Sequence, residues 1–306
     1  MYMSRYYSAE VKTLEHTPTG AVQVMSFDTL EAPHSGKGFA SPAIRQELNS
    51  LEAGNFLLLP QEFCTVAPQF AEGHINIDPD KGRSREESRN QIKFGQLIIN
   101  DSISRERVEY VAIKPLTTPN RAAHELGAML TVNALAKQGK LSPALRPLGF
   151  YRLPDGDNRV ALLTKYEHSV LTLDNLFWDP NYDPSEVQTR AALGHCAVSL
   201  GELHSVGIVH SDAQVKNIAA DNRGVRYVDL EGAQKISQPS GRIDSFTARR
   251  LTEIDIRTCL ESLNGHGQDL IADSFVPTYH DMVRRPDSTI PQDAVMESDE
   301  ILEMVH

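Results

Sequence analysis

Residues 209–217 read VHSDAQVKN, and DLEGA follows at residues 229–233. The first stretch places His210, Asp212 and Asn217 within eight residues, directly after a long amphipathic segment. Asp229 comes directly after the short apolar run VRYV. This pattern fits either a catalytic loop or a polar connection between two apolar elements. The rest of the chain decides between the two interpretations.

Length and charge narrow the class of protein. The chain has 306 residues, which is typical of one large domain or two lobes, and a net charge of −11, which argues against a general nucleic-acid binder. No run of about 18 apolar residues predicts a membrane span, and the first residues do not resemble a signal peptide. Three widely spaced cysteines favour reduced thiols. We therefore expect a cytoplasmic protein that does not contact membranes.

The first half of the chain alternates strand patterns with one helix. A Thr-Pro pair at residues 118–119 can begin this helix, and Gly139 can end it. Runs rich in Ile, Val and Leu predict strands before and after it. These runs are FLLLPQEFCTV (56–66), HINID (74–78), IKFGQLIIN (92–100), RVEYVAIKPL (107–116), LRPLGFYRL (145–153) and RVALLTKYE (159–167).

From about residue 171 the pattern becomes helical. Residues 185–207 form a long amphipathic segment that Gly207 can end. RLTEIDIRTCLESLNG (250–265) predicts another helix, and ESDEILEMVH (297–306) a short one at the end. The tail between them has few strong signals, and RRPDSTIPQD (284–293) is typical of a loop.

Together these residues resemble the protein-kinase-like superfamily, which includes protein kinases, aminoglycoside and choline phosphotransferases and RIO-type atypical kinases. The matching features are VAIK at 111–114, a Glu on the next helix, H-x-D-x-x-x-x-N and the Asp of DLEGA, over roughly residues 75–265. The resemblance implies an α+β fold with two lobes: an antiparallel N-lobe sheet with one helix, and a mainly helical C-lobe. We expect an N-terminal extension of unknown role at 1–70, the N-lobe at 71–167 and the C-lobe at 168–306.

The resemblance also implies ATP and Mg²⁺ as cofactors. Phosphoryl transfer asks a protein mainly for positioning and charge neutralisation, and magnesium prefers oxygen ligands. Asn217 and Asp229 are the expected metal ligands, and Asp212 would orient the acceptor hydroxyl or take its proton. Lys114 would hold the phosphates, with Glu125 as its partner. The TKYE segment (164–167), which includes Lys165 and Tyr166, would bind adenine through its main chain, and His210 would tie the loop to neighbouring backbone.

Several positions depart from the family pattern. No G-x-G-x-x-G precedes VAIK; the loop DKGRSREESR (80–89) stands there, either contacting phosphate through its cations or simply solvated. Ser211 replaces the usual Arg or Gly between His and Asp. Gln214 stands where many protein kinases have Lys, and Lys216 lies two positions further on. Gln214 can hydrogen-bond a γ-phosphate without neutralising it.

Two acidic residues after the loop have alternative interpretations. Glu231, in D-L-E instead of D-F-G, is either a further metal ligand or an exposed acid. Asp255 either receives main-chain amides of the catalytic loop or is an acid near a helix N-terminus, favoured by the helix dipole. Phe177 and Trp178 either pack a loop or stack on a ligand, and His195, His204 and His210 are more simply core or surface residues than a metal site.

Only about two dozen residues separate Asp229 from Asp255, and no A-P-E occurs there. So short a segment favours a small-molecule hydroxyl acceptor, or an atypical kinase, over docking of a protein substrate. Two alternatives stay open: a pseudokinase-like nucleotide-binding or scaffolding protein, and a transferase of nucleotidyl (AMP) groups.

Overall fold

The computed structural model describes residues 19–31, 38–60, 70–77, 92–101, 106–154, 159–167, 171–173, 185–221, 224–236, 243–263 and 268–304. These form two compact units. The sheet unit comes from the described parts of 1–30, 46–119 and 147–166, and the helical unit from those of 31–45, 120–146 and 167–306. Within the described ranges, no helix combines the length and the apolar character needed to cross a bilayer.

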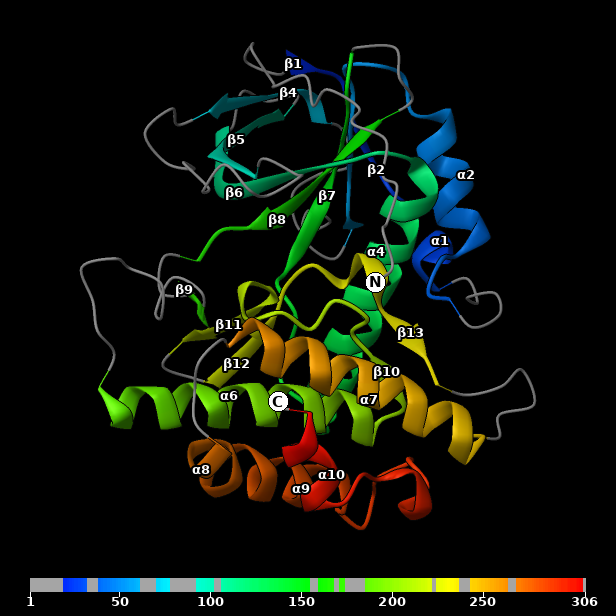
Figure 1. Ribbon diagram of the computed structural model, residues 1–306. Coiled ribbons are helices and arrows are strands. Elements are labelled where there is room, and N and C mark those ends of the chain that lie inside the picture. The colour runs from blue at the N-terminus through cyan, green and yellow to red at the C-terminus, as the bar shows by residue number, and fades with distance from the viewer. Residues whose placement is uncertain are drawn as a thin grey trace. The chain divides into compact units, whose positions relative to one another are not determined.

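One sheet of eight strands dominates the sheet unit (Figure 1), in the order β1-β4-β5-β6-β8-β7-β3-β2. The strands are β1 (Thr19–Gly20), β2 (Val22–Val24), β3 (Phe56–Leu58), β4 (Phe70–Ile77), β5 (Lys93–Asp101), β6 (Glu106–Leu116), β7 (Pro147–Arg152) and β8 (Val160–Lys165). Neighbouring strands are antiparallel except β2 and β3, which are parallel. Two short helices, α1 (Phe27–Glu31) and α2 (Pro42–Ser50), follow β2 in the chain.

The segment from β1 to β2 connects the two ends of this strand order. β1 pairs with β4, and after one residue the chain continues as β2, which pairs with β3. The approach is so close that a Cβ on Gly20 would lie 1.7 Å from the carbonyl oxygen of Gly54. Only glycine fits there. Residues for which the sequence indicated no role thus complete the sheet.

The core of the sheet unit follows the period of two that strands impose. On β6, Val111 and Ile113 are fully buried, whereas Val108 and Tyr110 on the other face are 42% and 46% exposed. The buried side chains of this core are Phe56, Leu58, Ile75, Leu97, Ile99, Val111, Ile113, Leu148, Tyr151, Leu153, Ala161 and Leu163.

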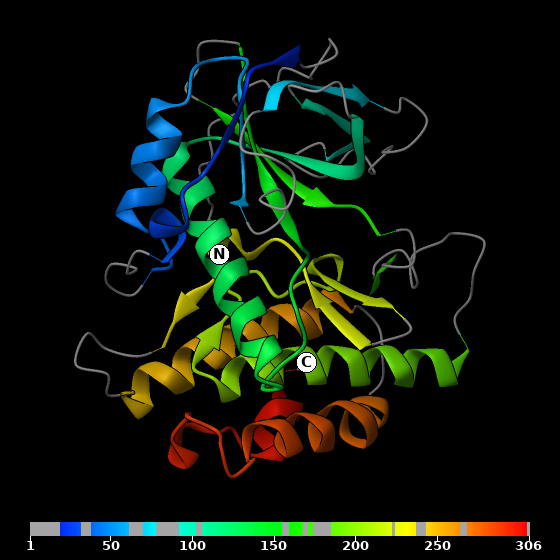
Figure 2. The same ribbon diagram turned by 180° about the vertical axis from the view of Figure 1, so that it is seen from behind.

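The helical unit is organised around α6, which packs against α7 and α9 (Figures 1 and 2). Ser185 caps α6 in a capping box with Gln188. Cys196 of α6 meets Cys259 of α7; the hydrogen bond with Cys196 and burial raise the pKa of the Cys259 thiol well above its ordinary value. The helical elements are α4 (Pro119–Lys137), α6 (Glu186–Ser205), α7 (Ser245–Ser262), α8 (Gln268–Leu270), a π-helical turn η3 (Ile271–Phe275), α9 (Val276–Val283), a 3₁₀ turn η4 (Gln292–Ala294) and α10 (Ser298–Glu303).

Five short strands and two 3₁₀ turns complete the helical unit. One small sheet pairs β10 with β13, and another has the order β12-β11-β9. These elements carry the stretches VHSDAQVKN (209–217) and DLEGA (229–233). They are β9 (Leu171–Thr172), β10 (Ile208–Val209), η1 (Val215–Asn217), β11 (Ile218–Asp221), β12 (Gly224–Tyr227), η2 (Leu230–Gly232) and β13 (Gln234–Lys235).

The mixed α+β class is confirmed, and a large, mostly antiparallel sheet with several helices is compatible with a kinase-like fold. The predicted strands and helices are confirmed within the described residues, but the start of α7 differs and the helices α1, α2 and α9 were not predicted. α7 begins at Ser245, five residues earlier than predicted, because Asp244 caps it through a hydrogen bond from the Thr247 amide. The tail also contains α9, which the weak signals did not predict. Predictions for 80–89, Cys64, Phe177 and Trp178 lie outside the described residues.

Candidate active site

The buried carboxylate of Asp255 anchors the loop that follows α6. Gly207 ends the helix with φ +74°, and β10 leads the chain into the loop. The main-chain amides of His210 and Ser211 donate to Asp255 Oδ2 and Oδ1, at 2.6 and 2.7 Å. Ser211 has φ +65°, a conformation rare outside glycine. These two charge-assisted hydrogen bonds hold the loop in its strained shape.

Asp255 therefore plays the first of its two predicted roles. Its side chain is 1% exposed and lies in the middle of α7, so the alternative, an acid near a helix N-terminus, is wrong. A third donor is His204 Nε2, 3.2 Å from Oδ2. Because a carboxylate only accepts, His204 donates through Nε2, and in the neutral ring Nδ1 then accepts from the hydroxyl of Tyr279 at 2.9 Å. Burial, with the nearby Asp255 charge, raises the pKa of Tyr279.

His210 ties the loop to the chain before DLEGA, as predicted. Its ring is fully buried, and Nε2 lies 3.0 Å from the carbonyl oxygen of Val228. Together with His204, it thus has a structural partner in the core. Burial lowers the pKa of His195, which lies on the same helix as His204. His204 and His210 are therefore core residues with hydrogen-bond partners, and His195 is partly buried.

The predicted acid and amide of the loop are hydrogen-bonded to each other. Asn217 Nδ2 donates to Asp212 at two points: the main-chain oxygen at 2.8 Å and Oδ2 at 2.9 Å. Gln214 Nε2 donates to the other carboxylate oxygen, Oδ1, at 2.8 Å. The Asp212 carboxylate is therefore fixed in orientation, and Gln214 contributes by holding it. Lys216, in the turn η1, is exposed.

Asn217 is placed beside the DLEGA turn by the hairpin that follows it. Residue 218 pairs with Tyr227 across β11 and β12, and the Val228 amide donates to the main-chain oxygen of Asn217 at 3.3 Å. Both side-chain hydrogen bonds of Asn217 use Nδ2, which leaves its amide oxygen as the atom for a further ligand. Asp229 follows with φ +55° and leads into η2.

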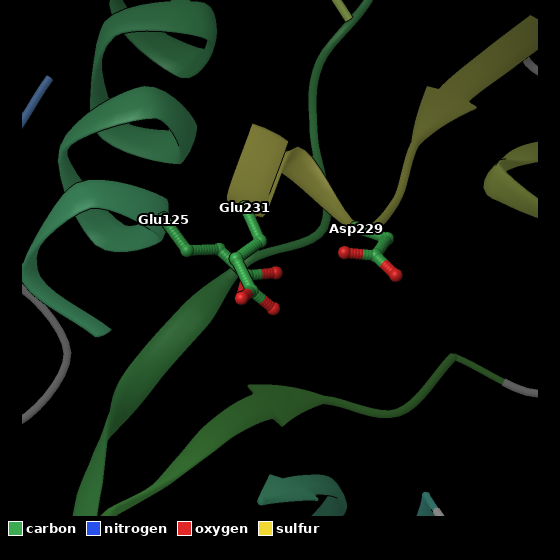
Figure 3. A group of neighbouring side chains, drawn as sticks. All are labelled: Glu125, Asp229 and Glu231. Carbon is green, nitrogen blue, oxygen red and sulfur yellow. The ribbon is translucent and has the colours of Figure 1, made fainter. Parts of the chain in front are cut away.

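Three carboxylates meet next to this turn (Figure 3). Glu125 comes from α4, Asp229 precedes η2, and Glu231 lies within it; one oxygen from each lies within 4.8 Å of the others. Glu125 is 2% exposed, whereas the other two are partly buried. Arg121, one turn before Glu125 on α4, pairs with Glu231 at 2.8 Å.

This donor set suits magnesium. Carboxylate and amide oxygens are its preferred ligands, and clustered negative charge in a partly buried site favours a divalent cation. Asp229, Glu231 and the amide oxygen of Asn217 could hold the ion, with Glu125 close by. The sequence did not predict that Glu125 would lie among the acids, nor that Arg121 would pair with Glu231. The spacing of Arg121 and Glu125, four residues apart on one helix, was the available signal.

The remaining predicted residues lie in the sheet unit. Lys114 is on β6 opposite Leu162, and its side chain is 7% exposed. Lys165 ends β8, and its Nζ lies 3.4 Å from Oε2 of Glu109. Burial by itself would raise the pKa of Glu109, but Arg107 and Lys165 outweigh it and hold that pKa below the ordinary value.

Tyr166 is engaged in the sheet on both its main chain and its ring. Its amide donates to the carbonyl oxygen of Tyr110 at 2.9 Å, and its ring packs on Phe94 with 4.8 Å between centroids. Main-chain recognition of adenine in this segment would therefore use groups other than the Tyr166 amide.

Comparisons with known proteins add little. No family model and no curated protein matches the chain. Among solved structures that match, WaaP in complex with acyl carrier protein is 13% identical, covering 85% of this chain and 89% of that one, with a TM-score of 0.43. So low a TM-score does not establish a shared fold, and this likeness identifies no family for the chain.

Proposed function

We propose that this protein is an ATP- and Mg²⁺-dependent phosphotransferase of the kinase-like superfamily, with the two-lobed fold of that superfamily. The main support is that Asn217 donates hydrogen bonds to Asp212, in a loop whose main-chain amides are held by Asp255. This arrangement supports the proposal because phosphoryl transfer depends on a positioned carboxylate beside metal-binding oxygens.

Asp212 is proposed to orient the acceptor hydroxyl and accept its proton. Gln214 and Asn217 each donate to one oxygen of its carboxylate, so the side chain is pre-positioned. Gln214 cannot neutralise a phosphate, and Lys216 is exposed. We therefore expect slow transfer.

Asn217, Asp229 and Glu231 would hold magnesium, which supplies neutralisation of phosphate charge when bound. Lys114 is proposed to hold the phosphates with Glu125 as its partner, and the segment of Lys165 and Tyr166 to hold adenine. A fixed cation beside the phosphates neutralises part of their charge during transfer.

A small-molecule hydroxyl is the proposed acceptor. α7 begins at Ser245, so only residues 230–244 separate Asp229 from this helix. The net charge of −11 disfavours nucleic acid as a partner. We propose a cytoplasmic protein that acts on a soluble substrate.

Incubation with ATP and Mg²⁺, with the nucleotide products followed over time, tests this function. We expect ADP to form slowly, Asp212→Asn to lower the rate about 10²- to 10⁴-fold, and Asp229→Ala to abolish it. Asp273→Ala is the matched control, because the Asp273 side chain is 60% exposed on η3 and pairs with Arg190 at the surface.

The same experiment distinguishes the alternatives. AMP or pyrophosphate among the products would indicate nucleotidyl transfer. ATP binding without turnover would favour a pseudokinase-like binding or scaffolding protein. A protein whose thermal stability does not respond to ATP and Mg²⁺ would contradict both enzymatic functions.

A further inference from the structure

A short stretch before α2 packs against His124, the residue of α4 that precedes Glu125. Phe39 is fully buried in the helical unit, and its ring meets the ring of His124 edge-on with 5.7 Å between centroids. The ammonium of Lys235 lies 5.1 Å from the centroid of the same ring. His124 directly precedes Glu125 on α4, so this contact lies one residue from the cluster.

His124 connects three segments that are far apart in the sequence. Its Nδ1 lies 3.4 Å from the Phe39 amide, and its Nε2 lies 2.7 Å from the carbonyl oxygen of Ala233. A main-chain amide only donates and a carbonyl oxygen only accepts. These partners therefore select the neutral ring with the proton on Nε2, which satisfies both hydrogen bonds at once.

The Ala233 end of this connection leads back to the catalytic loop. The Ala233 amide closes η2 by donating to the main-chain oxygen of Leu230. β13 starts at the next residue and pairs with β10, which enters the loop. Gln234 Nε2 also lies 3.3 Å from the hydroxyl of Ser211. A group that holds Ala233 thus acts on both the acidic turn and the loop.

An attachment of this kind acts against the repulsion between like charges within the cluster. Three carboxylates with oxygens within 4.8 Å favour separation of α4 from the turn. Arg121 opposes this by pairing with Glu231. The hydrogen bond from His124 to Ala233 is a second link between the same helix and the same turn, and it is independent of the carboxylates.

We propose that His124 is a positioning residue which, together with Phe39, holds α4 against the turn 229–233 and so sets the spacing of the carboxylates that bind the cation. This inference rests on the proposed function for its cation. It makes the stretch 38–39 part of the site, although that stretch lies far from every motif in the sequence.

Two substitutions separate the two hydrogen bonds. His124→Gln can still donate to Ala233 from an amide nitrogen at about the reach of Nε2, but it lacks the acceptor at Nδ1. His124→Asn can still accept from the Phe39 amide but cannot reach Ala233. His280→Gln is the matched control, since His280 Nε2 also lies 2.8 Å from a carbonyl oxygen, that of Met296, away from the cluster.

Amide hydrogen exchange and Mn²⁺ binding followed by electron paramagnetic resonance are the readouts, in folded protein without nucleotide. We expect His124→Asn to speed exchange at Ala233 about tenfold and to weaken Mn²⁺ binding about three- to tenfold. His124→Gln speeds exchange at Phe39 and changes Mn²⁺ binding less. His280→Gln changes neither.

Unchanged exchange in the turn of His124→Asn would overturn the proposal, and so would faster exchange with unchanged Mn²⁺ affinity, which would make the histidine merely structural. Wild-type protein that binds no Mn²⁺ would instead count against the proposed phosphotransferase function. The exchange rates would still decide whether His124 holds the turn.

Discussion

Two buried carboxylates of the helical unit, Asp255 and Glu125, illustrate opposite arrangements. Asp255 accepts hydrogen bonds from two loop amides and from His204, so its charge is met by donors on every side. Glu125 lies beside two further carboxylates, Asp229 and Glu231. The first arrangement anchors the loop by itself. The second places three carboxylates close together, an arrangement that a bound cation would stabilise.

The largest expected effect comes from disturbing the anchor. Asp255→Asn replaces one acceptor oxygen by a donor that faces other donors, so we expect about 3–5 kcal/mol loss of unfolding free energy. Urea unfolding measures it. Asp273→Asn, on an exposed side chain, should cost well under about 1 kcal/mol; an equal cost for both variants would remove the distinction.

Tyr279→Phe tests the second layer of the anchor. Loss of the hydroxyl leaves His204 Nδ1 without its donor, at a cost of about 1–2 kcal/mol at neutral pH. Because the pKa of Tyr279 is raised in the folded state, the unfolded chain ionises first, and stability falls as pH rises above about 10. Above that pH, the unfolding free energy of the variant should fall less steeply than that of the wild type, by about 1.4 kcal/mol per pH unit. Parallel curves for the two proteins above that pH would contradict the assignment.

Glu231→Gln tests the cluster. It removes one of three like charges and also the pair with Arg121, so we expect little change in melting temperature. Mn²⁺ affinity should fall about tenfold, equivalent to about 1.4 kcal/mol. Glu303→Gln, at an exposed position of α10, is the control. A strongly destabilised variant with unchanged Mn²⁺ affinity would make Glu231 an anchor like Asp255.

The smallest effect is expected for Glu109 in the sheet unit, a partly exposed carboxylate held by two cations. Its lowered pKa means that its contribution is present above the ordinary value and is lost as pH falls below about 4.5 through the folded pKa. Glu109→Gln should cost about 0.5 kcal/mol or less at pH 7. The unfolding free energy of both proteins is measured as a function of pH below 7. If it falls with acid equally in the variant and the wild type, the ion pairs of Glu109 contribute nothing.

Much of the fold was predictable because the signals are local. The alternation of buried and exposed residues in RVEYVAIKPL, the Thr-Pro start of α4 and the glycine after α6 each depend on neighbours in the chain. The start of α7 was missed because its first turn is polar and only the cap Asp244 marks it. α9 was missed because its apolar positions lie among strong turn formers.

The candidate site likewise has features that the sequence predicted and features that it did not. The order of Asp212, Asn217 and Asp229 along the chain was legible in the sequence, and the structure places Asp212 and Asn217 in direct contact. The sequence did not predict that Glu125 approaches Glu231, nor that His124 links Phe39 to Ala233. They join residues up to about two hundred positions apart.

The sequence by itself determined which elements form and which residue types occupy the loop, because periodicity, caps and turn residues act over a few positions. Only the tertiary structure decided which polar groups meet: Asp255 with the loop amides, Glu125 with the other acids, and the segment from Thr19 to Val24 with two distant strands. The physical reason is that hydrogen bonds and charge contacts need ångström-scale approach, and packing of remote segments alone sets that approach.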